Sequence, residues 1–590
     1  MKIKYFLMLL FCAMACHSVF AQFVLLSYPI EKSVMQRNAA NTASVTIAGQ
    51  VVSSSLLATA GYRFRTLSAA GVPGVAGPTT TLPLTANGMF FGTTTMSKGW
   101  YLCEIIYNGI VYASSRFGIG DVFIIAGQSN AQGMPNPTWA LPVTTNYPEW
   151  IVGSSDNKTC TKNLPEMFGT FFSFFNASDA VKHGSLSPTG NTIWCYGVVG
   201  KLISKANGGM PVAFFNAASA GSTVTQWYQG AQGIAAPNGY VGGAQFCDVG
   251  KYQGPFLGQP YTPLKSALNY YGSIFGVRGI LWHQGEADSD LALGAAYKVA
   301  SSADYANKLI AVINKSRADF ANPNLTWFIS NASVSNGQAP NATVRAGQTS
   351  VVNAGSGVIG ADSDYDGAGT TQFGWRADSV HFAESKKSAL TWLGNKWFNQ
   401  IGANGVRIEH GFVPSLTYSK NGDLRSLTAQ AGYAEYRWGN DINGAIAGAT
   451  TNVFTTDQFY TGIRCFIKDA NGNWHASQRV NLGQYSAQRE HAIIDGDDQA
   501  EQGDFEWRVY PNPYYAEFAT EFAVEQDNSS VRLEILDSEG IVIKTLVDNP
   551  HAKGIWKYPV TNTGIYNNGM HYMRLKINES FMVKRILKDK

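Results

Sequence analysis

The chain has 590 residues, of which 45% are hydrophobic and 14% are charged, and its formal net charge is +3. A single hydrophobic core does not hold a chain of this length, so the sequence predicts several domains. The low net charge and the hydrophobic content argue against a nucleic-acid-binding protein, a membrane-surface protein and a disordered chain.

The N-terminus is predicted to be a secretory signal peptide over residues 1–21. Lys2 and Lys4 provide a basic start, and residues 6–15 form an apolar run that is too short to span a bilayer. A small-residue cleavage context ends at Ala21. A lipoprotein signal acylated at Cys16 is an alternative, although the residues before it lack the usual leucine. No other stretch reaches the roughly 20 apolar residues of a membrane helix, so no membrane span is expected.

Residues 22–119 are predicted to form an N-terminal β-domain. Segments such as Ser44–Gly49 and Trp100–Tyr107 are rich in β-branched and aromatic residues, and Gly, Pro and Asn clusters separate them. Nothing in this stretch suggests chemistry.

Strands alternate with helices from Asp121 onward. Val122–Ala126 is a continuous apolar run, which is typical of a strand buried on both faces. Similar runs recur at 211–215, 274–282, 325–329 and 357–361, and helical periodicity occurs at 198–206, 305–315 and 383–401. This alternation predicts an α/β domain with a parallel sheet over 120–404, in which ligands bind at the carboxyl ends of the strands.

The remaining residues return to a β pattern. Residues 410–485 fit a small sandwich, and 486–504 are polar and acidic, as in a linker. A last β unit occupies 505–590 and ends in a basic strand.

The cysteines predict neither a disulfide scaffold nor a zinc site. Five remain after the signal peptide, widely spaced, with no C-x-x-C pair and no histidine at ligand spacing: Cys103, Cys160, Cys195, Cys247 and Cys465. One bridge among Cys160, Cys195 and Cys247 and a set of buried free thiols both fit the sequence. We expect no metal and no organic cofactor.

The candidate nucleophile is Ser129 in the sequence Gly127-Gln-Ser-Asn130, directly after the first apolar run. A serine there lies at the carboxyl end of a strand, and Gly127 permits a tight turn and a close approach of substrate. The chain contains no G-x-S-x-G elbow. Because a serine hydroxyl is a poor nucleophile, it needs a histidine base and a carboxylate that orients the histidine.

Three histidines lie in the α/β segment: His183, His283 and His381. Asp378 precedes His381 by three residues, so its carboxylate can accept the Nδ1 proton while Nε2 faces outward. Ser129, Asp378 and His381 are therefore predicted to form a catalytic triad. As an alternative, Ser129 and Asp378 are ordinary helix caps.

Three motifs together resemble the block motifs of SGNH hydrolases: Gly127-Gln-Ser-Asn130, His283-Gln-Gly-Glu286 and Asp378-x-x-His381. They are similar to the carbohydrate-esterase branch, which includes sialate O-acetylesterases and family 6 acetylxylan esterases. The resemblance covers roughly residues 120–402. It implies a central flavodoxin-like, three-layer α/β SGNH domain with a parallel sheet, flanked by the N-terminal β-domain and two C-terminal β-sandwiches.

The resemblance also implies a role for each site residue. Ser129 is the nucleophile, His381 the base and Asp378 its orienting group. The oxyanion hole uses the Ser129 N–H, the Gly221 N–H and the Gln284 side chain, although the segment around Gly221 departs from the Gly-Gly version of sialate esterases. Glu286 and His283 are expected to be structural.

The C-terminal unit resembles a type A sorting domain of type IX secretion, on the basis of Val509-Tyr-Pro-Asn-Pro513 and the basic final strand. The resemblance implies a Bacteroidetes-type bacterium and the type IX machinery as a partner. The protein is then secreted or placed on the outer cell surface, after export through the periplasm. Residues 410–485 resemble an Ig-like module.

The sequence thus predicts a secreted serine esterase that removes acetyl groups from carbohydrate, either sialic acid or a plant polysaccharide such as acetylxylan. The alternative is a non-catalytic, cell-surface carbohydrate-binding or adhesin-like protein on an esterase fold, which the 13% aromatic content also permits.

Overall fold

A computed structural model describes most of the chain: residues 23–52, 56–68, 71–136, 139, 151–154, 174–176, 186–240, 257–365, 373–440, 444–458, 460–482, 507–510, 518–524, 526–536, 542–560, 569–578 and 580–588. The chain divides into two compact units, one of residues 22–482 and one of 483–590 together with 1–21. The predicted signal peptide, the linker, Cys160, His183 and Cys247 lie outside the described residues.

The first unit begins with two antiparallel sheets whose facing side chains form a core. One sheet contains β1 (Phe23–Tyr28), β3 (Thr42–Val52) and β7 (Met89–Ser97). The other is built from β4 (Thr59–Leu67), β5 (Pro73–Ala76), β6 (Thr80–Pro83), β8 (Gly99–Tyr107) and the first half of β9 (Ile110–Gly127). Val45, Ile47, Ile105 and Phe117 are fully buried between them. Alternate residues along these strands point into this core.

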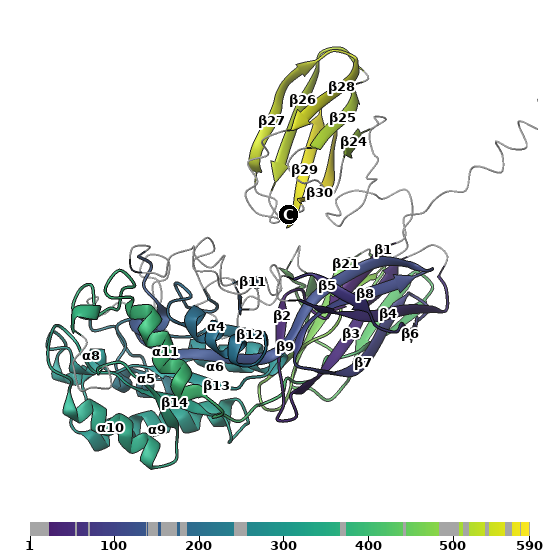
Figure 1. Cartoon of the computed structure of the whole chain (residues 1–590). Helices are drawn as coiled ribbons and strands as arrows, with labels where there is room; N and C mark the ends of the chain where they lie inside the picture. Colours follow the sequence, from purple (N-terminus) through teal and green to yellow (C-terminus); the bar gives the residue numbers. More distant parts are fainter. Residues whose placement is uncertain are drawn as a thin grey trace, which may run out of the picture. The chain divides into compact units, whose positions relative to one another are not determined.

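Strand β9 belongs to two sheets. Its first half pairs antiparallel with β8 from Ile110 to Ile119, and β2 (Ser33–Gln36) pairs parallel with it. Its second half, from Asp121 to Gly127, pairs parallel with a strand on either side. One continuous strand therefore joins the β region to the α/β region, as can be followed in Figure 1.

The α/β region is built on a parallel sheet with the strand order β11-β10-β12-β9-β13-β14-β15. Its strands besides β9 are β10 (Ile151–Ser154), β11 (Phe174–Asn176), β12 (Val212–Asn216), β13 (Gly279–His283), β14 (Trp327–Asn331) and β15 (Val358–Asp362). All neighbours pair parallel except β11, which runs antiparallel at the edge. The strand predicted at 274–282 is shorter than expected, because η2 (Leu268–Gly272) and α7 (Ser273–Phe275) continue helically into it.

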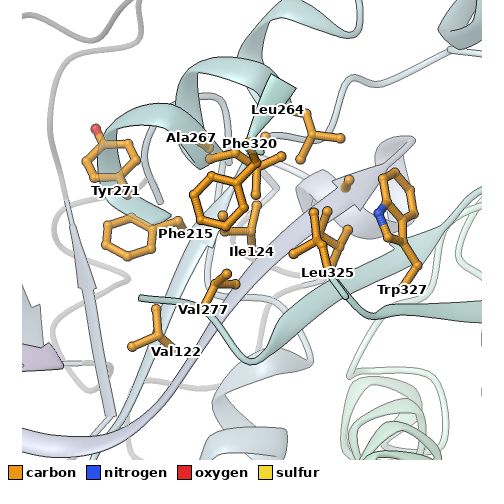
Figure 2. Close-up of a cluster of buried hydrophobic side chains, with 14 of the residues drawn as sticks. Val122, Ile124, Phe215, Leu264, Ala267, Tyr271, Val277, Phe320, Leu325 and Trp327 are labelled. Atoms are coloured by element: carbon orange, nitrogen blue, oxygen red, sulfur yellow. The ribbon is translucent and has the colours of Figure 1, made fainter. Parts of the chain in front are cut away.

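Helices cover both faces of this sheet. One face carries α5 (Val224–Ala231), α6 (Thr262–Ala267), α9 (Ser302–Asp319) and α10 (Ala342–Asn353), and the other carries α4 (Tyr196–Ala206) and α11 (Ala389–Ile401). Along β9, Val122 and Ile124 point to the first face while Phe123 and Ile125 point to the second. Figure 2 shows part of the hydrophobic core between the first face of the sheet and its helices. In this core the ring of Phe215 stacks on the ring of Tyr271 with 4.3 Å between their centroids. The predicted three-layer α/β arrangement is therefore present.

Two predicted helices have different bounds in the structure. The helix predicted at 305–315 runs from Ser302 to Asp319, because the Ser301 side chain caps its start by accepting from the Asp304 N–H. The helix predicted at 383–401 begins at Ala389 instead. Lys387 and Ser388, just before it, have positive φ angles of 55° and 53°, which a regular helix cannot contain.

A β-sandwich closes the first unit. One sheet contains β16 (Leu416–Asn421), β17 (Leu424–Ala429) and β20 (Val453–Thr456), and the other contains β18 (Glu435–Asn440), β19 (Gly444–Ala445), β21 (Tyr460–Lys468), β22 (Trp474–Ala476) and β23 (Val480–Leu482). The Tyr28 hydroxyl donates to the Ala476 carbonyl at 2.8 Å, and Phe466 packs on Tyr270. The sandwich is thus docked on both earlier regions.

The second compact unit contains two antiparallel sheets around one core. Their strands are β24 (Trp507–Tyr510), β25 (Phe518–Val524) and β28 (Gly554–Val560) in one sheet, and β26 (Ser529–Leu536), β27 (Val542–His551), β29 (Gly569–Ile577) and β30 (Ser580–Lys588) in the other. Leu533, Ile535 and Met573 are fully buried in this core. The predicted basic final strand is β30.

Three cysteines that the structure describes, Cys103, Cys195 and Cys465, are buried and unbridged. No helix in the described part of the chain is long and apolar enough to cross a membrane. Within the same residues, no group of His, Cys, Asp or Glu side chains is arranged to hold a metal ion.

A buried ion cluster surrounds Asp121, at the point where β9 passes from one sheet to the other. The Asp121 carboxylate, which is fully buried, accepts from Arg37 at 2.9 and 3.0 Å and from Arg278 at 2.8 Å. Burial acts to raise its pKa, but the charges of Arg278 and Arg37 outweigh burial and hold the pKa below its usual value. Arg37 comes from the β region and Arg278 from the α/β region, so the cluster connects the two.

Replacing Asp121 with Asn is expected to lower the stability of the first unit by about 3–5 kcal/mol, because two buried guanidinium groups lose their counter-charge. The measurement is the unfolding transition of the full chain by calorimetry or denaturant. The control is Glu435→Gln, which breaks a half-exposed pair with Arg437 and is expected to cost no more than about 1 kcal/mol. Equal losses in the two variants would contradict this assignment.

Candidate active site

Ser129 is the first residue of the short helix α2 (Ser129–Gln132), directly after β9. Gln128 before it is still extended, with φ −109° and ψ −154°. Gly127 has φ +129°, and a Cβ on it would lie 2.0 Å from the His283 carbonyl oxygen of the adjacent strand. The glycine is therefore required by the neighbouring backbone, whereas the sequence suggested that it makes room for substrate.

The structure brings Ser129, His381 and Asp378 together. The His381 Nε2 atom lies 2.7 Å from the Ser129 hydroxyl oxygen, and its Nδ1 atom lies 2.7 Å from the Asp378 carboxylate. Ser129 is buried, His381 is partly exposed and the Asp378 side chain is 39% exposed. The two motifs, far apart in the sequence, thus meet with the order of contacts that a serine–histidine–aspartate triad requires.

Asp378 is held as an anion by the turn that carries it. Its Oδ1 atom accepts from the backbone N–H groups of Val380 at 3.0 Å and His381 at 2.7 Å, and Ser379, which lies between Asp378 and Val380, has a positive φ of 68°. Burial acts to raise the pKa of Asp378, but the hydrogen bonds from the His381 ring and from these amides lower it well below its usual value. The carboxylate is therefore ionised at neutral pH and fixes the proton on Nδ1 of His381.

An aromatic ring lies against the other side of the base. The Trp139 indole stacks on the His381 ring with 6.2 Å between centroids and 23° between planes. The Glu384 N–H donates to the Trp139 carbonyl at 2.9 Å, which ties the segment around Trp139 to the chain just after His381. The ring restricts the orientations open to the imidazole.

Gln284 follows β13, but its amide group is fully used inside the protein. Its Nε2 atom donates to the Ser222 carbonyl at 3.1 Å and to Asp288, and its Oε1 atom accepts from the Tyr305 hydroxyl at 2.9 Å. An amide nitrogen has two hydrogens, and both have acceptors here. These hydrogen bonds disagree with the predicted role of Gln284 as an oxyanion donor. They show instead that Gln284 holds the Ser222 backbone, Asp288 and Tyr305 together.

Gly221 lies in the loop between β12 and α5, next to the strand end that carries Ser129. The Ser219 N–H of this loop donates to the Gly127 carbonyl at 2.9 Å. Gly221 has φ +71°, and a Cβ there would lie 2.9 Å from the Tyr240 ring, so the position favours glycine. The structure is thus compatible with the predicted use of its N–H, which stays a prediction.

His283 and Glu286 form a buried pair, and Glu286 also contacts Asn130, the residue after Ser129. The His283 Nε2 atom lies 3.1 Å from Glu286 Oε1, and both side chains are fully buried. Burial acts to raise the pKa of Glu286, but His283, Arg376 and Asn130 outweigh it and lower the pKa to about 2.

Sequence analysis assigned no role to four residues that the structure places at the site: Gln128, Asn130, Asp288 and Arg376. Gln128 Oε1 accepts from the backbone N–H groups of Gly285 and Ala287, both at 3.0 Å. Gln128 and Asn130 are the residues on either side of Ser129, and this position could have indicated from the sequence that they belong to the site. Arg376 carried no signal, because its acidic partner Glu286 comes from another segment of the chain.

Asp288 is fully buried and holds two segments of the site. Its Oδ2 atom accepts from Gln284 and from the Val224 N–H at 3.0 Å. Burial raises the pKa of Asp288 to about 7. Because the folded-state pKa is raised, the folded protein favours the protonated carboxyl, and the stability derived from it is lost as pH rises through the folded pKa.

The variant Asp288→Asn retains an oxygen acceptor and removes this titration. Wild type is expected to lose stability relative to Asp288→Asn as pH rises from about 4 to about 7, with no further loss above that range. Denaturant unfolding at several pH values measures the difference. Asp304→Asn serves as the control, because the pKa of Asp304 is lowered, chiefly by Lys308 against the effect of burial. A pH-independent difference for Asp288→Asn would contradict the prediction.

Comparison with known proteins gives a family for the central segment. Residues 119–401 match the family model described as carbohydrate esterase, sialic acid-specific acetylesterase. The chain matches none of the curated proteins. Among solved structures, a carbohydrate acetylesterase from Xanthomonas citri is 14% identical with a TM-score of 0.37, over 78% of this chain and 100% of that chain. A β-glucuronidase from Parabacteroides merdae is 8% identical with a TM-score of 0.24, over 96% of this chain and 77% of that chain. The matched segment contains Ser129, Asp378 and His381, and the match agrees with the predicted resemblance to carbohydrate esterases.

Proposed function

We propose that the protein is a secreted serine esterase that removes acetyl groups from carbohydrate hydroxyls. The observation that carries the proposal is the contact chain Ser129–His381–Asp378, with 2.7 Å at each of its two contacts. This chain of contacts lies inside the segment that matches the carbohydrate-esterase family model.

The first half of the proposed reaction forms an acetyl-enzyme. His381 Nε2 accepts the Ser129 hydroxyl proton while the oxygen attacks the ester carbonyl carbon, and the carbonyl electron pair moves to its oxygen. The Asp378 carboxylate stabilises the resulting imidazolium. When the tetrahedral intermediate collapses, the imidazolium gives its proton to the departing sugar oxygen.

The second half releases acetate. His381 takes a proton from water, which attacks the acetyl carbon, and the proton then returns to Ser129 as the acyl bond breaks. In both halves the oxyanion is stabilised by backbone N–H groups, and we assign them to Ser129 at the start of α2 and to Gly221. Gln284 supports the loop through Ser222. Loss of one oxyanion donor typically lowers turnover by about 10²–10³-fold.

The position of Ser129 in the sheet supports an SGNH layout. The order β12-β9-β13-β14-β15 corresponds to the doubly wound order 2-1-3-4-5, since β9 comes first in the chain and β12 second among these strands. In such sheets the chain leaves the first strand to one side and later returns on its other side. Ligands bind at that point, beyond the carboxyl end of the first strand, and Ser129 follows the carboxyl end of β9.

The two ends of the chain support the proposal that the protein is exported from the cell. We propose that residues 1–21 direct secretion and that the C-terminal β unit is a type IX sorting domain, on the motif at 509–513 and the basic strand β30. The 410–485 sandwich is proposed as an Ig-like accessory module. The acyl group is proposed to be acetyl and the alcohol a hydroxyl of sialic acid or of a polysaccharide such as acetylxylan.

The variant Ser129→Ala is expected to lower hydrolysis of a chromogenic acetyl ester by about 10⁴-fold or more, because the nucleophile is lost. Initial rates on that ester and on acetylated carbohydrates give the measurement. The matched control is Ser350→Ala, an exposed serine on α10, which should retain wild-type rates. If wild type and Ser129→Ala both hydrolyse the ester only at the background rate, the non-catalytic carbohydrate-binding alternative replaces the esterase.

The identity of the base is tested with two histidine variants. His381→Ala should lower kcat by several orders of magnitude, because the His381 Nε2 atom is the acceptor that contacts the Ser129 hydroxyl. His183→Ala should retain activity. The reverse result for this pair would show that His183 is the base.

The pH profile tests the ionisation of Asp378. The pKa of Asp378 lies below its usual value, so this carboxylate stays ionised at acid pH. Down to about pH 4, kcat/KM should therefore fall with the protonation of one group only. Asp378→Asn should lower kcat by about 10²–10⁴-fold, and the exposed Asp423→Asn should not change it. An acid limb with two titrating groups would contradict an Asp378 that stays ionised.

A further inference from the structure

Asn130 connects the nucleophile to the loop that carries the base. This residue follows Ser129 in α2 and is fully buried. Its Nδ2 atom donates to the Val380 carbonyl at 3.0 Å, and its Oδ1 atom accepts from the Phe382 N–H at 3.2 Å. Val380 and Phe382 are the residues on either side of His381, so one side chain holds the backbone both before and after the base.

Asn130 is itself held in place by the buried pair of Glu286 and His283. Its Nδ2 atom also donates to Glu286 Oε1 at 2.9 Å, and that carboxylate is fixed by His283 at 3.1 Å. Arg376, at the other end of the His381 loop, lies 3.7 Å from Glu286 and also donates to the Val380 carbonyl. All four of these side chains are buried, so solvent does not compete for their hydrogen bonds.

The turn that carries His381 also has hydrogen bonds of its own. The turn is closed by the Ala377 N–H donating to the His381 carbonyl at 2.8 Å, and Asp378 accepts from amides of the same turn. These bonds shape the turn but do not fix its distance from α2. The bonds of Asn130 do, because they link the residue next to Ser129 to the residues next to His381.

We propose that Asn130 is a positioning residue that sets the distance between the Ser129 hydroxyl and the His381 Nε2 atom, with Glu286 and Arg376 as its anchors. The proposal rests on the proposed esterase function of the same triad. Asn130 is buried away from solvent and acts through His381 rather than on substrate. Its loss should therefore affect the chemical step and leave substrate binding unchanged.

Asn130→Ala is expected to lower kcat by about 10–100-fold, the effect of a displacement of about 1 Å between reacting groups, with KM changed less than about threefold. Asn130→Asp keeps the acceptor for the Phe382 N–H but loses both donated bonds, so its kcat should also fall. The folding control is Asn38→Ala in the β region, which removes hydrogen bonds to Thr42 and Glu409 and should leave kcat unchanged. Thermal unfolding confirms that each variant is folded. An unchanged kcat in both Asn130 variants, or a loss confined to KM, overturns the proposal.

A double-mutant cycle separates positioning from a general structural effect. The readout is the rate at which a fluorophosphonate labels Ser129 in the full-length protein, which remains measurable without a base. Asn130→Ala should slow labelling about 10–100-fold in the wild-type background and less than about twofold in the His381→Ala background, because the group that it positions is then absent. Equal factors in both backgrounds overturn the proposal.

The esterase function and the positioning role of Asn130 are contradicted by different results. If Ser129→Ala and His381→Ala hydrolyse acetyl esters at wild-type rates, the proposed function is wrong. If those two variants are inactive and the Asn130 variants are folded and fully active, the function stands and the positioning role of Asn130 is wrong.

Discussion

The buried Asp121 carboxylate and strand β9 form the constraint on which the first unit depends. The strand is part of both the antiparallel and the parallel sheet, and Asp121 lies where it passes from one to the other. Arg37 and Arg278 neutralise the carboxylate from the two sides. A change in the packing of either sheet would expose an unpaired charge to a nonpolar interior, so the two sheets are held in one arrangement. Ser129 follows the end of this strand, so the position of the site is fixed by the same packing.

The carboxylates of the unit show how environment sets the protonation of one kind of group. Asp121 and Glu286 are fully buried, yet both have lowered pKa values because cationic or hydrogen-bond donor groups surround them. The pKa of Asp378 is also lowered, by hydrogen bonds from the His381 imidazole and from backbone amides. Asp288 lacks an adjacent cation that outweighs its burial, and its pKa is raised to about 7. Three of the four therefore serve as fixed negative charges, whereas Asp288, which supports the loop at Gln284 and Val224, becomes protonated as pH falls through about 7.

The fold was largely predictable because its elements follow local patterns. Runs such as Val122–Ala126 have the continuous apolar character of buried parallel strands, and they became strands. The errors occurred where the pattern was ambiguous. The apolar residues Ile274, Phe275 and Val277 belong to a helix and a connection rather than to a strand, since an apolar run alone does not distinguish the two. Positive φ angles at Lys387 and Ser388 delay the last helix, and no sequence pattern marks them.

The sequence by itself determined the candidate triad and the family resemblance. Asp378 and His381 are three residues apart, and a serine at a strand end needs a base, so local spacing was sufficient. Only the tertiary structure decided that Gln284 has no free amide hydrogen, that Gly127 makes room for the His283 carbonyl, and that Asn130 joins Ser129 to the loop of His381. The physical reason is that these roles depend on which donor meets which acceptor across segments as many as 252 residues apart. Local spacing sets which groups are available, and the packing of the sheet and its loops decides which of them meet.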